Sequence, residues 1–250
     1  MRRIWILPML LAAFLAASGC GGGGELRVSA AASLQASFTE YGGKFEEAEA
    51  SFSFAGSDVL AAQIRSGARP DVYAAANTTL PDALYVEQLV EKPIRFASNE
   101  LVLAKPANSR KITSLADIRR SGVRLAIGSP TVPVGSYTRT VLAKLLRSQR
   151  EAIYANVRTE EPDVSGIVGK LTQGAVDAGF VYRTDVRATN GRLEEITLPS
   201  RLQPVVEYSV AVVRGTERPA EAKAFVYGLL SGDGRRALDG AGFQPPARTG

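Results

Sequence analysis

The stretch that decides the fold is ELRVSAAASLQASFTEYGGKFEEAEASFSFAGSDVLAAQIRSGARPDVYAAA, residues 25–76. Three short apolar runs in it favour β-strands, and two segments with apolar side chains three or four residues apart favour helices. In chain order these elements are expected at residues 25–30, 34–50, 52–54, 59–66 and 72–75. This β-α-β-α-β order predicts a parallel, doubly wound sheet.

The same order recurs in residues 123–183. Strands and helices alternate there at residues 125–127, 137–147, 157–158, 164–172 and 178–181. Two such halves predict an α/β clamshell of two lobes, each a doubly wound mixed sheet flanked by helices. Two extended apolar runs, at 101–104 and 208–213, would form the hinge crossovers that carry the chain out of the first lobe and back. Terminal helices at 220–230 and 234–238 would then pack on the first lobe.

The first 24 residues have the pattern of an export segment. Arg2 and Arg3 precede a short apolar run that ends in small residues and Cys20, which is typical of a secretory signal. That run is shorter than the roughly 20 residues of a membrane-spanning helix. The expected organisation is a lipoprotein signal peptide (1–20), a glycine tether (21–24), the first part of lobe 1 (25–100), lobe 2 (101–208) and the return to lobe 1 (209–250).

Composition excludes several kinds of chemistry. The chain has no histidine, and Cys20 is its only cysteine. A Ser-His-Asp triad, a Cys-His dyad and a histidine-based metal site are therefore excluded, and a chain cleaved before Cys20 has no disulfide partner. The 30 basic and 25 acidic residues are scattered, without a basic stripe interleaved with aromatic side chains. We therefore expect neither nucleic-acid binding nor an enzyme, and no cofactor.

Small and polar residues stand where four expected strands give way to helices. They are Ser33, Ser57 in Gly56–Asp58, the run Pro133–Ser136, and Pro162–Val164. Helix N-termini carry unpaired N–H groups and partial positive charge, so four of them at one sheet edge predict an anion site. Each residue alone would be read as an ordinary helix cap. Asp58 opposes anion binding unless its carboxylate caps the helix or faces away.

Several longer motifs resemble those of one known family of proteins. These are AASL (31–34), GSDVLAAQIRSGARPDVYAAA (56–76), FASNELVLAKP (96–106), PVGSY (133–137), GFVYRTD (179–185), VEYSVAVVRG (206–215), EAKAFVYGLLS (221–231) and AGFQPP (241–246). Together the chain resembles the periplasmic molybdate-binding proteins of ABC transporters, across nearly its whole length. The resemblance implies the periplasmic-binding-protein clamshell, a molybdate or tungstate ligand, and a membrane permease as partner.

The resemblance also implies five ligand contacts. Ser33 and Ser57 would donate through their hydroxyl and backbone N–H groups, Val134 and Val164 through backbone N–H groups, and Tyr182 through its phenol. Gly135 or Ser136 is an alternative to Val134. The segment Ala17-Ser18-Gly19-Cys20 resembles a bacterial lipobox, which implies a lipid on Cys20. We thus expect an exported, membrane-anchored monomer, periplasmic or at the cell surface.

Three other interpretations stay open at this stage. The same fold would suit another small anion, such as sulfate or an organic acid. A lipid-tethered sensory module without a transport role would also fit, and Asp58 favours it. An exported enzyme would have to use the only local acidic cluster near the predicted cleft, Glu160, Glu161 and Asp163, whose plainer interpretation is an exposed loop with a helix cap.

Overall fold

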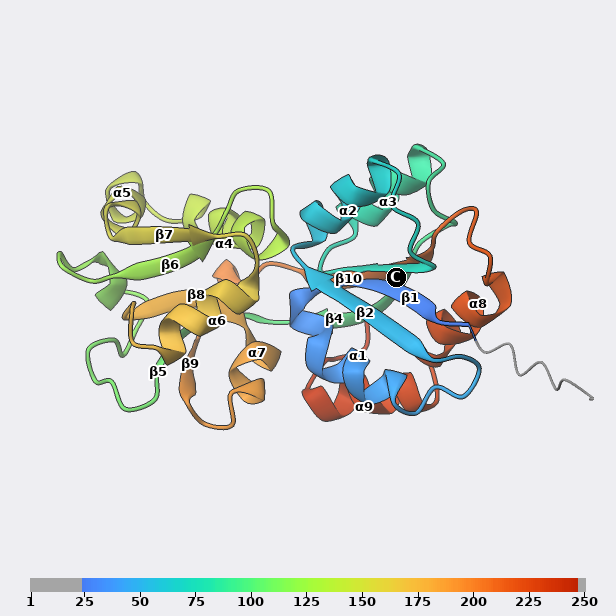
Figure 1. Ribbon diagram of the computed structural model, residues 1–250. Helices are drawn as coiled ribbons and strands as arrows, with labels where there is room; N and C mark the ends of the chain where they lie inside the picture. Colours follow the sequence, from blue (N-terminus) through green and yellow to red (C-terminus); the bar gives the residue numbers. More distant parts are fainter. Residues whose placement is uncertain (1–23, 247–250) are drawn as a thin grey trace, which may run out of the picture.

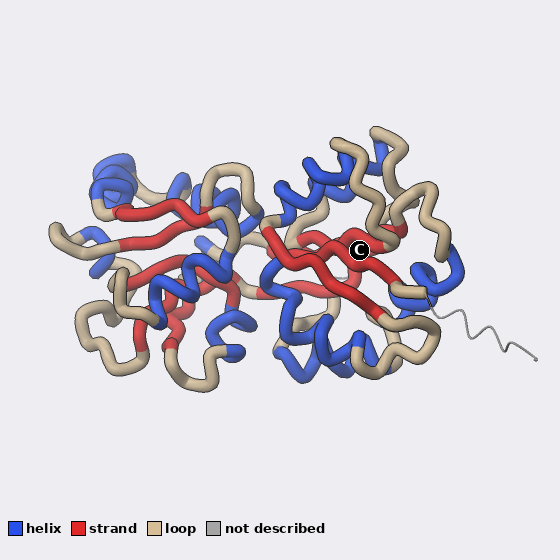
Figure 2. The backbone as a smooth tube through the Cα atoms, in the orientation of Figure 1, coloured by secondary structure: helices blue, strands red, loops and turns tan. Residues whose placement is uncertain are grey.

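The chain folds into two α/β lobes that lie side by side (Figure 1). The computed structural model describes residues 24–246, and each lobe contains one five-stranded sheet flanked by helices (Figure 2). The two-lobed α/β fold predicted from the sequence is confirmed. The expected signal segment, Cys20 and tether residues 21–23 lie outside the described residues. None of the helices in the described part of the chain has the length and hydropathy that a membrane crossing requires.

The first lobe is built on a sheet of order β2-β1-β3-β10-β4. Strand β1 pairs in parallel with β2 and β3, whereas β10 runs antiparallel to β3 and β4. The strands are β1 (Leu26–Ala31), β2 (Ala50–Ala55), β3 (Val72–Ala75), β4 (Ile94–Asn99) and β10 (Val206–Val212). The helices are η1 (Ala32–Leu34), α1 (Gln35–Gly42), α2 (Ser57–Arg65), α3 (Thr79–Val86), α8 (Pro219–Gly228) and α9 (Asp233–Ala241).

The second lobe repeats this plan with a sheet of order β7-β6-β8-β5-β9. Strand β6 is parallel to β7 and β8, and β5 is antiparallel to β8 and β9. The strands are β5 (Leu101–Pro106), β6 (Leu125–Gly128), β7 (Val157–Glu161), β8 (Ala178–Tyr182) and β9 (Leu193–Thr197). The helices are η2 (Asp117–Arg119), α4 (Pro133–Ala143), α5 (Arg147–Ala155), α6 (Val164–Thr172), α7 (Arg183–Ala188) and η3 (Ser200–Leu202).

The central strands are buried on both faces. In β3, Val72 and Ala74 belong to one apolar cluster, whereas Tyr73 and Ala75 belong to a second cluster beneath α2 and α3. All four side chains are fully buried. A strand covered on both faces reads as a continuous apolar run rather than an alternation, which is why the sequence pattern marked these strands clearly.

Element boundaries differ from expectation where local signals were weak. Helix α1 ends at Gly42 rather than near residue 50, because two adjacent glycines disfavour a helix interior. The expected helix at 137–147 is two helices: α4 begins four residues earlier, at Pro133, and α5 follows after a break. Proline is favoured in the first turn of a helix, where its missing N–H is not needed. The elements α3, β4, α7, β9, η2 and η3 were not predicted individually.

The chain crosses between the lobes twice. Strand β4 ends at Asn99 in the first sheet and β5 begins at Leu101 in the second, so Glu100 alone separates them. The return lies between β9 and β10. The expected boundary at residue 208 falls inside β10, whose Val206 pairs with Asn99 of β4. We therefore propose that the returning segment of lobe 1 begins at Val206.

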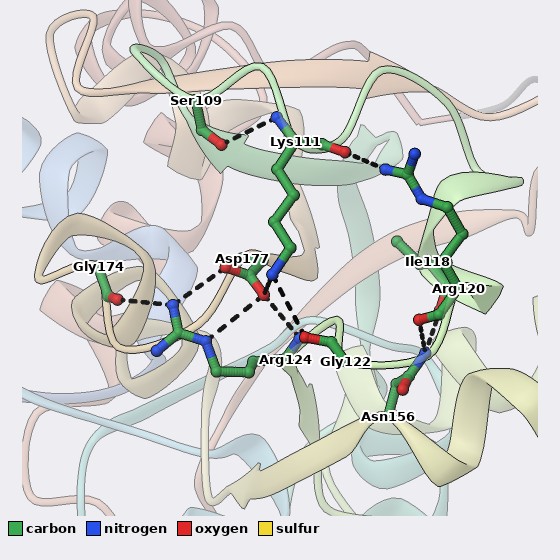
Figure 3. A network of polar contacts seen from close by, with 9 residues as sticks. All are labelled: Ser109, Lys111, Ile118, Arg120, Gly122, Arg124, Asn156, Gly174 and Asp177. Carbon is green, nitrogen blue, oxygen red and sulfur yellow. Dashed lines mark hydrogen bonds and ion pairs between the residues drawn. The ribbon is translucent and has the colours of Figure 1, made fainter.

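An ion-pair network connects loops of the second lobe (Figure 3). Asp177 accepts hydrogen bonds from Lys111 Nζ at 2.6 Å and from the Arg124 N–H at 2.8 Å, and the Arg124 guanidinium also donates to it. Burial by itself would raise the pKa of Asp177, but the hydrogen bonds from Arg124 and Lys111 outweigh it and lower the pKa to about 2. The network joins the β5–β6 connection to the turn before β8.

Asp177→Asn is expected to lower the free energy of unfolding by about 1–3 kcal/mol near neutral pH, because two cations lose a charged acceptor. Because folding lowers the pKa of Asp177, its carboxylate stabilises the folded state at pH values above its ordinary pKa of 3.8. This stabilisation is lost as the pH falls towards 2. Denaturant titrations of both proteins should thus converge as pH drops through this window. Glu151→Gln, at the exposed ion pair with Arg147, should change little. A pH-independent difference for Asp177→Asn would contradict this account.

Candidate functional site: a small cavity between the lobes

A small cavity lies where the two lobes meet. Its volume is about 20 Å³, and a cavity needs roughly 10–15 Å³ to hold one water molecule. The five predicted contact residues, Ser33, Ser57, Val134, Val164 and Tyr182, all line it. The cavity suits a ligand of a few heavy atoms, and the tertiary structure brings together the whole predicted set.

Each lining segment comes from the carboxyl end of a parallel strand. In the first lobe, β1 leads into η1 with Ser33, and β2 leads into α2 with Ser57. In the second lobe, α4 presents Val134, α6 begins at Val164, and Tyr182 ends β8. Ligands bind at this edge of open α/β sheets. Gly135 and Ser136, the alternatives to Val134, do not line the cavity.

Three of the four helix starts at the cavity have no side-chain cap. The starts of η1, α2 and α4 lack a capping hydrogen bond, so the first N–H groups have no partner within their own helix. Helix α6 differs, because Asp163 Oδ1 accepts from the Gly166 N–H at 3.0 Å. The backbone thus offers uncommitted donors and partial positive charge to whatever occupies the cavity.

The Ser57 hydroxyl is held with its proton uncommitted. Its Oγ accepts a hydrogen bond from the Ala76 N–H at 3.1 Å. The Ser57 carbonyl accepts from the buried Tyr73 phenol at 2.7 Å, which fixes the backbone at the start of α2. A hydroxyl has one proton and two lone pairs. Because the donor on Ala76 uses a lone pair, the Ser57 proton is left for a ligand.

Tyr182 supplies a buried donor without a partner. Its hydroxyl is one of the few buried side-chain oxygens in residues 24–246 that make no hydrogen bond. Burial raises the pKa of Tyr182 well above its ordinary value, so the phenol stays protonated. A buried polar atom of this kind normally has a partner. Because Tyr182 lines the cavity, its phenol proton is free to be donated to an acceptor there.

The two lobes come into close contact at Gly56. A Cβ added there would lie 2.4 Å from the Pro162 carbonyl oxygen of the second lobe, closer than such atoms can come. Gly56 has φ −57°, which any residue adopts. Glycine is therefore needed at this position for contact between the lobes and not for backbone conformation.

The carboxylates near the site have other structural roles. Asp58 does not line the cavity. It lies in the first turn of α2, where negative charge stabilises a helix, although its buried Oδ1 accepts no hydrogen bond from residues 24–246. Glu160 pairs with Arg139 at 2.7 Å, and Glu161 accepts from Thr159 Oγ1 at 2.6 Å. With Asp163 capping α6, the contacts of the acidic cluster lend no support to the enzyme interpretation.

The lining contains no lysine, arginine or histidine. Among residues 24–246, no group of three or more His, Cys, Asp or Glu side chains is arranged to hold a metal cation. The one carboxylate in the lining is Asp163, which caps α6, and the donors of the site are neutral hydroxyl and amide groups from both lobes. Such donors bind an anion by hydrogen bonding without neutralising its charge by an ion pair.

Sequence reasoning missed two kinds of residue here. It did not predict that Gly56 would meet Pro162, because a contact between lobes leaves no local signal. It read Tyr208 only as part of a strand, although the Tyr208 hydroxyl lies 2.9 Å from Ser33 Oγ. Alternation along a strand indicates which side chains share a face, but not what a buried phenol bonds to.

Comparison with known proteins shows the family to which this chain belongs. The chain belongs to the bacterial extracellular solute-binding proteins, whose family model matches residues 26–244. It is 36% identical over 231 residues to the molybdate-binding protein ModA of Mycobacterium tuberculosis, covering 90% of this chain and 86% of that protein. It is 27% identical to YvgL of Bacillus subtilis, a putative ABC transporter substrate-binding lipoprotein, covering 97% and 98%. The periplasmic molybdate-binding protein of Azotobacter vinelandii shares the fold, with a TM-score of 0.80 at 21% identity over 89% of this chain and all of that one.

Gly56→Ala is expected to hold the lobes apart, because the added methyl group collides with the Pro162 carbonyl. Small-angle scattering should show a larger radius of gyration, and ligand affinity should fall at least tenfold, the equivalent of about 1.4 kcal/mol. Gly169→Ala in α6 is the matched control, since a Cβ there meets nothing within 4 Å. A Gly56→Ala protein with unchanged scattering and affinity would refute the contact.

Proposed function

We propose that this chain captures molybdate or tungstate outside the cytoplasm and delivers it to the permease of an ABC transporter. The observation that carries the proposal is the convergence of uncapped helix N-termini and the Ser33, Ser57 and Tyr182 hydroxyls on one small cavity. The molybdate-binding relative at 36% identity supports this choice of ligand.

Neutral donors suit a small dianion that must lose its water on binding. Each hydrogen bond to a charged group contributes roughly 1.5–3 kcal/mol net, so several together offset the cost of desolvation. Ser33 and Ser57 belong to the first lobe, and Val134, Val164 and Tyr182 to the second. Since an anion gains the full set only when the lobes are closed, binding favours the closed form.

The test is calorimetric titration of the purified protein with molybdate, tungstate, sulfate and phosphate. We expect molybdate and tungstate to bind more tightly than sulfate, because the relative at 36% identity is a molybdate-binding protein. Metal–oxygen bonds are longer than sulfur–oxygen bonds, so the size of the cavity can separate these anions. Preferential binding of sulfate would show that the cavity is an anion site but that molybdate is not its ligand. A folded protein that binds none of the four would overturn the proposal.

Tyr182→Phe is expected to weaken molybdate binding about 10- to 150-fold, the equivalent of one hydrogen bond to a charged group. Without ligand, the variant should unfold at an unchanged or higher temperature, because the Tyr182 hydroxyl makes no hydrogen bond to other groups in residues 24–246. Calorimetry gives the first quantity and a thermal melt the second. Unchanged affinity in Tyr182→Phe would remove this phenol from the ligand set.

We further propose that a lipid on Cys20 anchors the protein to the membrane. The support is the sequence preceding Cys20 and the lipoprotein name of the Bacillus subtilis relative. Cys20→Ala should abolish incorporation of labelled fatty acid and move the protein from the membrane fraction to the soluble one. Ser18→Ala, which leaves the cysteine in place, is the control. Labelling that persists in Cys20→Ala would disprove the anchor.

A further inference from the structure

A chain of hydrogen bonds leads from the interlobe crossover to the cavity. Asn99, the last residue of β4, donates from Nδ2 to Thr184 Oγ1 at 2.8 Å and to the Tyr208 hydroxyl at 3.5 Å. The Tyr208 hydroxyl lies 2.9 Å from Ser33 Oγ. Asn99 and Tyr208 are buried and do not line the cavity, whereas Ser33 does.

The direction of these hydrogen bonds follows from counting protons. Asn99 Oδ1 accepts from the Glu100 N–H at 2.9 Å, so the amide nitrogen must face Thr184 and Tyr208. Both amide protons are then donated, one to each hydroxyl. The Tyr208 oxygen accepts from Asn99, and its single proton therefore goes to Ser33 Oγ.

The opposite direction would leave a buried donor unsatisfied. If Ser33 donated to Tyr208, the phenol proton would have no acceptor, since Ser33 and Asn99 are the only hydrogen-bond partners of this hydroxyl among residues 24–246. A buried unsatisfied donor is costly. Burial also raises the pKa of Tyr208 well above its ordinary value, so its proton is present throughout the physiological range.

Aromatic packing keeps the Tyr208 hydroxyl in position. Its ring makes edge-to-face contacts with Phe96, Tyr182 and Phe243, at centroid distances of 6.2, 6.0 and 5.2 Å. Phe96 and Phe243 lie in the first lobe and Tyr182 in the second. The phenol therefore has a fixed position next to two of the proposed ligand donors.

We propose that Tyr208, oriented by Asn99, is a positioning residue that commits the Ser33 hydroxyl to donate its proton into the cavity. This inference rests on the proposed oxyanion site and adds residues that do not touch the ligand. Ser33 then resembles Ser57 in its hydrogen bonding, because the Ser57 Oγ also accepts from a buried donor, the Ala76 N–H. In both serines a buried donor uses a lone pair and leaves the proton for the anion.

Titration with molybdate in a double-mutant cycle tests the inference. Tyr208→Phe should weaken binding about five- to tenfold, since the Ser33 hydroxyl is no longer oriented. In the Ser33→Ala background the same change should weaken binding less than twofold. In the Ser57→Ala background it should again weaken binding five- to tenfold, because Ser57 is held independently. A merely structural effect of Tyr208→Phe would be equal in all three backgrounds and would overturn the inference.

Two further variants make the outcome decisive. Tyr41→Phe is the matched control, because the buried Tyr41 phenol donates to the Phe225 carbonyl in lobe 1 and does not line the cavity; it should leave affinity unchanged. Asn99→Asp offers Tyr208 a competing acceptor, so its effect should be larger with Ser33 present than in the Ser33→Ala background. Equal effects would refute the inference. A wild-type protein that binds no oxyanion would refute the proposed function itself.

Discussion

The structure depends on burying each sheet on both faces. Strands that are covered on both sides need a helix after each parallel strand, and all those helices then start at the same sheet edge. In this chain η1, α2, α4 and α6 start in that way, two in each lobe. Packing the two edges against each other brings their N–H groups to one small cavity. The anion site is thus a consequence of how the sheets are covered, and the serine and tyrosine hydroxyls complete it.

A site of neutral donors has its own requirement, because each hydroxyl must present a proton and not a lone pair. Ser57 meets it through the Ala76 N–H, and Tyr182 through a phenol that burial keeps protonated. For Ser33 the hydrogen-bond chain through Tyr208 does the same. This series of hydrogen bonds begins at Asn99, beside the crossover between the lobes. The residues that join the lobes and those that orient a ligand donor are therefore neighbours.

Much of the fold was predictable because its signals are local. The alternation of apolar runs and helical segments follows from burial on both faces, as the four buried residues of β3 illustrate. Prediction failed where the deciding contact is distant or the local signal weak. Strand β9 reads LEEIT, which is too polar to suggest a strand, and is held only by pairing with β5. Helix α1 was predicted too long because apolar spacing continued past Gly42.

By itself, the sequence determined the strand–helix order, the absence of histidine and cysteine chemistry from the described residues, and five of the residues that line the cavity. The strand–helix order and the composition can be read from single segments of the sequence. The five site residues follow from the resemblance to periplasmic molybdate-binding proteins along the chain. Only the tertiary structure decided that Asp58 stays out of the lining, that Gly56 meets Pro162, and that Tyr208 bonds Ser33. Each of these depends on which side chains meet after the chain has crossed between the lobes and returned. A residue's partner across 175 positions is set by packing, and no local pattern encodes it.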